Sequence, residues 1–91
     1  MNKSEKLANA IGNRLEILMR KRGYSQTLMA YKTDISQAAI NRYINGKRIP
    51  AGDCIIKLAE ILNCSTDDIL MGLKTVPIMG KPYLYFLEVI L

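Results

Sequence analysis

The chain has 91 residues, of which 49% are hydrophobic and 23% charged, with three prolines and six glycines. A chain of this size and composition can bury one core, which excludes a disordered tract, a collagen-like repeat and a disulfide-stapled mini-protein. It contains no histidine. Ser-His-Asp, Cys-His and histidine-metal chemistry are therefore excluded, and we do not expect an enzyme.

The positive charge lies in the first half of the chain. Residues 11–50 contain eight basic and two acidic residues, a net charge of +6, whereas residues 51–91 contain three basic and five acidic residues, a net charge of −2. A polyanion-binding surface joined to a neutral scaffold has this distribution, but so does an ordinary solvated basic face.

A first helix is predicted from about Lys6 to Arg22. The apolar residues in this stretch recur at the spacing of one helical stripe, and Gly23 follows as a helix stop after three basic residues. The stripe consists of Leu7, Ile11, Leu15, Leu18 and Met19.

A short second helix is predicted from Gln26 to Lys32. Ser25 is a natural N-cap residue, and we expect Met29 and Ala30 to face the core. Thr33-Asp34 is expected to end the helix, because Asp tolerates the left-handed conformation of a tight turn.

Ser36 then caps a third helix, Gln37 to Ile44, which closes at Asn45-Gly46. Two helices joined by so short a turn form a helix-turn-helix arrangement. The side chains expected to face inward are Ile40, Tyr43 and Ile44.

The outer face of the third helix carries amides, a guanidinium and a methyl group, which are the groups that contact base edges in the major groove of DNA. No acidic residue lies on this face, so the pattern favours DNA reading over a solvated face. The residues are Gln37, Ala38, Asn41 and Arg42.

Two further helices are predicted before residue 74. Asp53 is expected to cap one that ends at Asn63, with an apolar face of Ile55, Leu58, Ala59 and Leu62. Ser65 and Asp68 have the spacing of a capping box, which starts a fifth helix, about Thr66 to Met71. The predicted fold is a compact all-α bundle of five helices.

The two cysteines, Cys54 and Cys64, lack the spacing of a metal or redox site. Their apolar neighbours predict buried free thiols in a reducing cytosol. No cofactor or metal constellation is present in the sequence, so we expect neither. The polar start of the chain resembles no signal peptide, which predicts a cytoplasmic protein.

Residues 11–70 resemble the lambda repressor/Cro type of helix-turn-helix domain, the XRE family. The resemblance implies a five-helix DNA-binding domain over residues 6–73. It also implies a transcription regulator that binds specific sequences in double-stranded DNA and acts as a repressor. The regulator would bind a pseudo-palindromic operator as a homodimer. A phage or bacterial origin and association with the nucleoid are implied as well. The segments that carry it are Gly23-Tyr24-Ser25-Gln26, Ile35-Ser36-Gln37, Ile40-Asn41-Arg42-Tyr43, Asn45-Gly46-Lys47-Arg48-Ile49-Pro50 and Leu58-Ala59-Glu60-Ile61-Leu62.

The resemblance also implies a role for individual residues. The residues that would contact bases are Gln37, Ala38, Asn41 and Arg42. The residues that would bind phosphates are Gln26, Ser36, Asn45, Lys47 and Arg48. Gln26 would in addition buttress Gln37. The sequence departs from the family at Asp34, where glycine is usual, at Thr33, which replaces a core aliphatic residue, and at Met19 and Ile44, which replace an ion pair.

Residues 74–91 form a short apolar tail outside the resemblance, with segments that favour β-structure. An exposed strand of this kind would aggregate, so we expect it to be covered. Our hypothesis is dimerisation through the tail and the fifth helix. Two alternatives stay open: the tail folds back over Leu28 and Tyr31, or it binds a protein partner, as in an antitoxin or anti-repressor.

Overall fold

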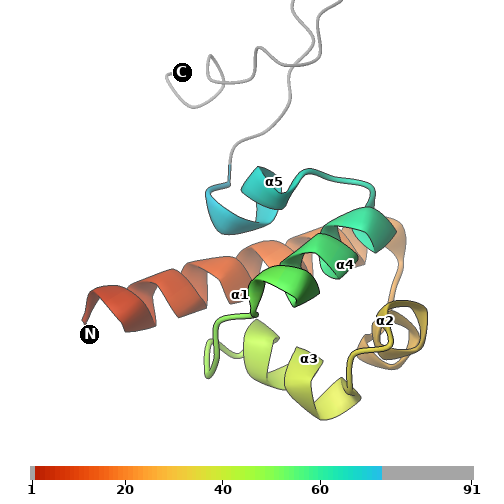
Figure 1. Cartoon of the computed structure of the whole chain (residues 1–91), viewed down its shortest axis with the longest axis horizontal. Coiled ribbons are helices and arrows are strands. Elements are labelled where there is room, and N and C mark those ends of the chain that lie inside the picture. The colour runs from red at the N-terminus through yellow and green to blue at the C-terminus, as the bar shows by residue number, and fades with distance from the viewer. Residues whose placement is uncertain (1, 73–91) are drawn as a thin grey trace, which may run out of the picture.

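The computed structural model describes residues 2–72, which form five α-helices and no strand (Figure 1). The all-α prediction is confirmed for this part of the chain. The predicted domain boundary at residue 73 and every prediction for the tail, residues 74–91, lie outside it. The helices are α1 (Lys3–Arg22), α2 (Gln26–Thr33), α3 (Gln37–Ile44), α4 (Gly52–Leu62) and α5 (Thr66–Leu70).

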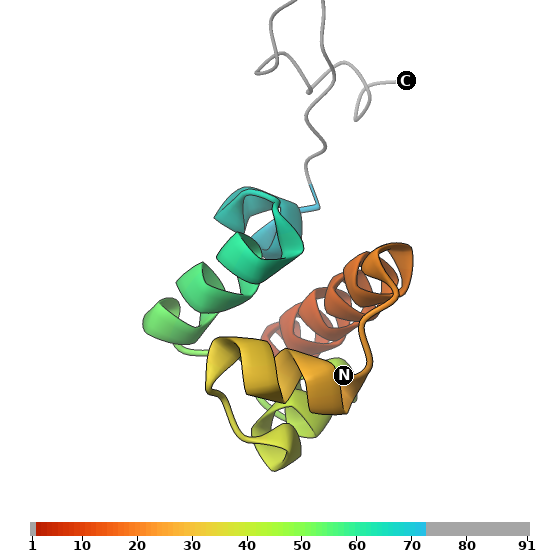
Figure 2. The ribbon, with the colours of Figure 1, turned by 90° about the vertical axis from the view of Figure 1, so that its right-hand side faces the viewer.

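Helix α1 crosses the molecule, with α2 and α3 on one side and α5 on the other (Figures 1 and 2). It begins at Lys3, one turn earlier than predicted, because the side chain of Asn2 accepts a hydrogen bond from the Glu5 N–H at 2.8 Å. Such a cap satisfies an N–H that has no partner within the helix. At the other end Gly23 takes the left-handed conformation, with φ 71°, as predicted.

One hydrophobic core joins all five helices. The prediction that Leu7 faces this core is wrong: its side chain is 46% exposed, and Leu18 is only half-buried. The buried stripe of α1 instead includes Ala8 and Gly12, each one residue after a residue of the predicted stripe. The core consists of Ile11, Leu15, Met19, Met29, Ile35, Ile40, Tyr43, Ile55, Leu58, Ala59, Leu62 and Ile69.

Helix α4 begins differently from the prediction. Its N-cap is Ala51, which makes no side-chain hydrogen bond to the helix, so the predicted cap at Asp53 is wrong. Asp53 lies in the first turn, where a carboxylate interacts favourably with the positive end of the helix dipole. The helix ends at Asn63, which takes the left-handed conformation with φ 53°.

Helix α5 begins at the predicted capping box. The Ser65 hydroxyl accepts from the Asp68 N–H at 3.0 Å, and Asp68 Oδ2 accepts from the Ser65 N–H at 3.0 Å. The helix ends at Leu70, one residue earlier than predicted, because Met71 leaves the helical conformation as the C-cap.

Two arginines of α1 hold the C-terminal ends of the last two helices. Arg14 donates to the carbonyl oxygens of Ile69 at 3.3 Å and Leu70 at 2.9 Å. Arg22 donates through Nε to the carbonyl of Leu62 at 3.1 Å. The last carbonyls of a helix lack partners within it and attract cations, so these contacts fix α4 and α5 against α1.

Both cysteines are free thiols, as predicted, but they are half-buried rather than fully buried. Burial and the neighbouring Asp68 carboxylate raise the pKa of the Cys64 thiol above its ordinary value of 9.0, partly offset by Arg22. No helix within residues 2–72 has the length and apolar character to cross a membrane.

Candidate nucleic-acid interface

Helices α2 and α3 and the turn between them form one end of the molecule, opposite α5 (Figure 2). Ser25 caps α2 and Ser36 caps α3, each hydroxyl accepting a backbone N–H three residues later at 3.1 Å, so both predicted starts are confirmed. Asp34 takes the left-handed conformation in the turn, with φ 59°, also as predicted.

The turn is tied to the end of α2 by a buried hydroxyl. Thr33, which belongs to α2, donates from Oγ1 to the Met29 carbonyl at 2.6 Å and accepts from the Ile35 N–H at 3.3 Å. A buried hydroxyl with both roles filled avoids the penalty of an unpaired polar group. Thr33 therefore replaces an aliphatic residue in the core at little cost and braces the turn.

The inner side of α3 packs into the core. Ile40 and Tyr43 are buried and Ile44 is half-buried. Burial, followed by a hydrogen bond to the Cys54 thiol, raises the pKa of the Tyr43 phenol above its ordinary value of 10.0, although nearby Arg48 opposes the shift.

Helix α1 sets how closely α3 can approach. A Cβ built on Gly12 would lie 2.6 Å from the Ile44 carbonyl oxygen and in contact with the Tyr43 carbonyl oxygen. Helix α1 therefore packs directly on the backbone of α3, with no side chain between them. Met19, the other residue predicted to replace the ion pair with Ile44, lies in the buried core. Ile44 packs against this core.

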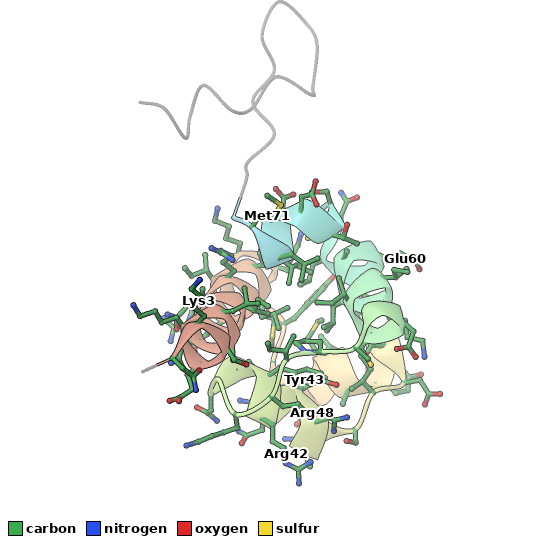
Figure 3. The ribbon with its side chains drawn as sticks, turned by 60° about the vertical axis from the view of Figure 1, so that its left-hand side comes forward. Lys3, Arg42, Tyr43, Arg48, Glu60 and Met71 are labelled. Atoms are coloured by element: carbon green, nitrogen blue, oxygen red, sulfur yellow. The ribbon has the colours of Figure 1, made fainter. Side chains whose placement is uncertain are left out.

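The outer side of α3 is exposed and contains no acidic residue. Figure 3 shows Arg42 pointing away from the body of the molecule, while Tyr43, the next residue, points into it. The four predicted base-reading residues are all exposed on this helix: Gln37, Ala38, Asn41 and Arg42.

The predicted phosphate-binding residues lie beside this face. Gln26 is half-buried at the start of α2, and Ser36 is exposed at the start of α3. Asn45 and the basic residues Lys47 and Arg48 are exposed in the loop after α3, where Gly46 supplies the left-handed conformation, with φ 69°.

Three amide side chains connect these groups, an arrangement that the sequence analysis missed. Asn41 Nδ2 donates to Gln26 Oε1 at 3.2 Å, so Gln26 has a partner on α3 four residues after Gln37, the residue that it was predicted to support. Asn45 Nδ2 donates to the Asn41 carbonyl at 2.9 Å and to Asn41 Oδ1 at 3.2 Å. The four-residue spacing of Asn41 and Asn45 on a helix could have signalled the second contact.

Several basic residues in the first half of the chain interact with groups of the protein itself and lie outside the predicted phosphate-binding set. Arg14 and Arg22 bind helix ends, as described above. Arg20 forms an ion pair with Glu16 at 2.7 Å, and Lys32 lies over the Tyr24 ring, 5.4 Å from its centroid. Arg42, Lys47 and Arg48 are then the cations of residues 11–50 that lie on α3 or the loop after it.

Two apolar side chains on α2 lie in solvent. Tyr31 is 85% exposed and Leu28 is 36% exposed. Within residues 2–72 no cluster of three or more metal-ligating side chains occurs.

Comparison with known proteins gives four similarities, two in sequence and two in structure. A family model described as "Helix-turn-helix" matches residues 15–69. The HTH-type transcriptional regulator ImmR of Bacillus subtilis (strain 168) is 34% identical over 61 residues, which cover 67% of this chain and 48% of ImmR. The chain thus spans about half the length of this relative.

Two solved structures share the fold. The restriction-modification controller protein C.AhdI from Aeromonas hydrophila matches with a TM-score of 0.66 and 24% identity, over 68% of this chain and 94% of that one. An HTH_3 family transcriptional regulator from Vibrio cholerae matches with a TM-score of 0.70 and 24% identity, over 77% of this chain and 39% of that one.

Proposed function

This chain belongs to the helix-turn-helix family HTH_3, and we propose that it is a transcription regulator that binds specific sequences in double-stranded DNA. The observation that carries the proposal is the outer side of α3, which is exposed, free of acidic residues and flanked by the groups expected to bind phosphates. An α-helix of this kind fits the major groove of B-form DNA.

The side chains of α3 divide by chemistry. Gln37 carries an amide that can pair with adenine, Arg42 carries a guanidinium that can pair with guanine, and the Ala38 methyl group can contact the methyl group of thymine. These contacts would specify sequence, with Arg42 supplying the strongest.

Contacts to phosphates would fix where the helix lies in the groove. Lys47 and Arg48, exposed after α3, supply positive charge on one side. Gln26 and the Ser36 hydroxyl supply hydrogen-bond donors on the other, since Ser36 Oγ accepts from the Ala39 N–H and keeps its own hydrogen. Such contacts determine register and affinity but carry no sequence information.

A single α3 covers only a few base pairs, so we propose a homodimer on two half-sites related by two-fold symmetry. A protein bound in this way excludes other proteins from the same DNA, and we therefore assign repression rather than activation. In this role the protein acts by binding alone and needs no catalytic activity. Its place of action is the cytoplasm, on nucleoid DNA.

Selection from random-sequence duplex DNA, with enrichment and sequencing at two salt concentrations, tests the proposal. We expect a recovered motif with two-fold symmetry, whose half-site spacing reports the geometry of the dimer. Binding that is weak, salt-sensitive and without a motif would overturn it, because charge attraction alone gives that result.

A further inference from the structure

The amides of Gln26, Asn41 and Asn45 form a hydrogen-bonded chain that runs in one direction over the surface of α2 and α3. Building on the DNA-binding function proposed above, we propose that Asn41 is a positioning residue and not a base-reading one. It holds Gln26 so that the N–H donors of Gln26 meet a DNA phosphate, and the same chain withdraws the Asn45 side chain from phosphate binding.

The direction of the chain follows from one group that can only accept. The backbone carbonyl of Asn41 lies 2.9 Å from Asn45 Nδ2. Exchanging the nitrogen and oxygen of that amide would place two acceptors against each other, so the carbonyl fixes the orientation of Asn45.

Each following amide is then fixed by the one before it. The second N–H of Asn45 meets Asn41 Oδ1 at 3.2 Å, which directs Asn41 Nδ2 toward Gln26. Gln26 must therefore accept this hydrogen bond through its oxygen, Oε1, at 3.2 Å. A flip of any single amide would break at least one of these contacts.

The two ends of the chain therefore offer opposite chemistry. Gln26 has used its acceptor and keeps both Nε2 hydrogens, which suit a phosphate because phosphate oxygens only accept. Asn45 has used both Nδ2 hydrogens and keeps Oδ1, an acceptor that a phosphate oxygen would repel. Of these two predicted phosphate ligands, the amide chain favours Gln26 and disfavours Asn45.

Asn41 itself is poorly placed to read a base. An asparagine that recognises adenine uses its carbonyl oxygen and its amino group together. In this structure the Asn41 oxygen accepts from Asn45 and one of its two amino hydrogens goes to Gln26. To read adenine, Asn41 would have only its second amino hydrogen and the second lone pair of its oxygen, unless it gave up these contacts.

A double-mutant cycle on DNA binding tests the proposal. The full chain would be measured as wild type, Gln26→Ala, Asn41→Ala and the double variant, on the selected DNA sequence at several salt concentrations. Each single variant should lose affinity by about two- to tenfold, the effect of one hydrogen bond. Because an amide carries no charge, neither variant should lower the slope of log affinity against log salt by the value of about 0.9 that the loss of one cation–phosphate contact gives.

The double variant should bind no more weakly than Gln26→Ala, because Asn41 acts through Gln26. Repeating the selection with Asn41→Ala should return the wild-type motif. Asn13→Ala is the matched control, since Asn13 is an exposed asparagine on α1 outside the amide chain; its affinity should equal that of wild type. Urea unfolding of each variant checks that the fold persists.

Two results would overturn the assignment of Asn41. Additive losses in the double variant, together with a changed base in the selected motif, would make Asn41 a base-reading residue. Unchanged affinity in both single variants would remove Gln26 from the interface. If wild type itself selects no motif, the proposed function fails and this inference with it, so the two failures are distinguishable.

Discussion

Gly12 of α1 lies against the backbone of Ile44 at the end of α3, where a Cβ on Gly12 would come within 2.6 Å of the Ile44 carbonyl oxygen. That separation is below the van der Waals contact of carbon and oxygen, and both partners are held in helices. The contact fixes the distance between the longest helix of the domain and the helix proposed to enter DNA.

We expect Gly12→Ala to destabilise the domain. In an open helix this change would stabilise by about 0.5–1 kcal/mol, because glycine is a poor helix former. Here the added methyl group must push two backbones apart, and overpacking of this kind costs about 1–3 kcal/mol. The free energy of unfolding in urea should therefore fall despite the better helix propensity.

Gly52→Ala is the matched control for this prediction. Gly52 begins α4, and a Cβ built there meets no atom within 4 Å. The same substitution should leave stability unchanged or raise it by up to about 1 kcal/mol. Equal effects at positions 12 and 52 would show that the close approach of α1 and α3 does not limit residue size.

Arg14→Met should weaken the attachment of α5. The change keeps most of the apolar stem but removes the donors to the carbonyls of Ile69 and Leu70. Hydrogen bonds from a charged group in a partly buried site are worth about 1.5–3 kcal/mol, and a loss in this range should appear in urea unfolding.

Arg20→Met provides the comparison, because Arg20 is exposed and its ion pair with Glu16 joins two residues of one helix. Exposed pairs of this type contribute about 0.3–0.5 kcal/mol. If both variants lost the same stability, Arg14 would be acting as an ordinary surface charge.

Stability should decline in alkaline solution as pH rises above about 9. The pKa of Cys64 is raised above its ordinary value of 9.0 by burial first and by Asp68 second. The thiol therefore ionises in the unfolded chain before it ionises in the folded one, and the unfolded state binds fewer protons in this range. By linkage the free energy of unfolding then decreases with pH.

Cys64→Ala should flatten this decline between pH 9 and the folded pKa, as followed by urea unfolding at a series of pH values. The pKa of Tyr43 is also raised, above its ordinary value of 10.0, so a second decline should remain at higher pH. An unaltered curve in Cys64→Ala would rule out Cys64 as the source of the first decline.

Arg42→Ala and Lys47→Ala should separate base reading from phosphate binding. Arg42→Ala should cost about 1–3 kcal/mol on the selected sequence and relax preference at one position, since a guanidinium distinguishes guanine from other bases. Lys47→Ala should weaken the affinity for all DNA sequences by the same factor. It should also lower the slope of log affinity against log salt by about 0.9. Uniform losses in both variants would contradict the assignment of Arg42 to base reading.

The helices were predictable because their ends carry local signals. Ser25, Ser36 and Ser65 each accept the backbone N–H that their spacing indicates, and Asp34 and Asn63 take the left-handed conformation. Such signals depend on a few consecutive residues, and a sequence displays them directly. Helix α1 begins before its predicted start because the Asn2 cap precedes the first apolar residue of the stripe.

The contacts that the sequence did not predict join partners that lie far apart in the chain. The contact between Gln26 and Asn41 joins residues 15 positions apart, and Arg14 reaches Leu70 across 56 positions. No local pattern indicates either contact. In the net charge of the sequence, Arg14 and Arg22 count the same as Lys47. Only the packing of α1 against α4 and α5 shows that the two arginines bind helix ends whereas Lys47 lies in the loop after α3.

The arginines bound to helix ends have one more consequence. A carbonyl carries a dipole but no net charge, so Arg14 and Arg22 keep their full positive charge in the field around the molecule while their side chains are held at helix ends. Such a field acts over distances of about 10 Å at an ionic strength of about 0.1 M and accelerates encounter with a polyanion. On DNA, these two residues would influence how fast the protein arrives, whereas the residues of α3 would decide how long it stays.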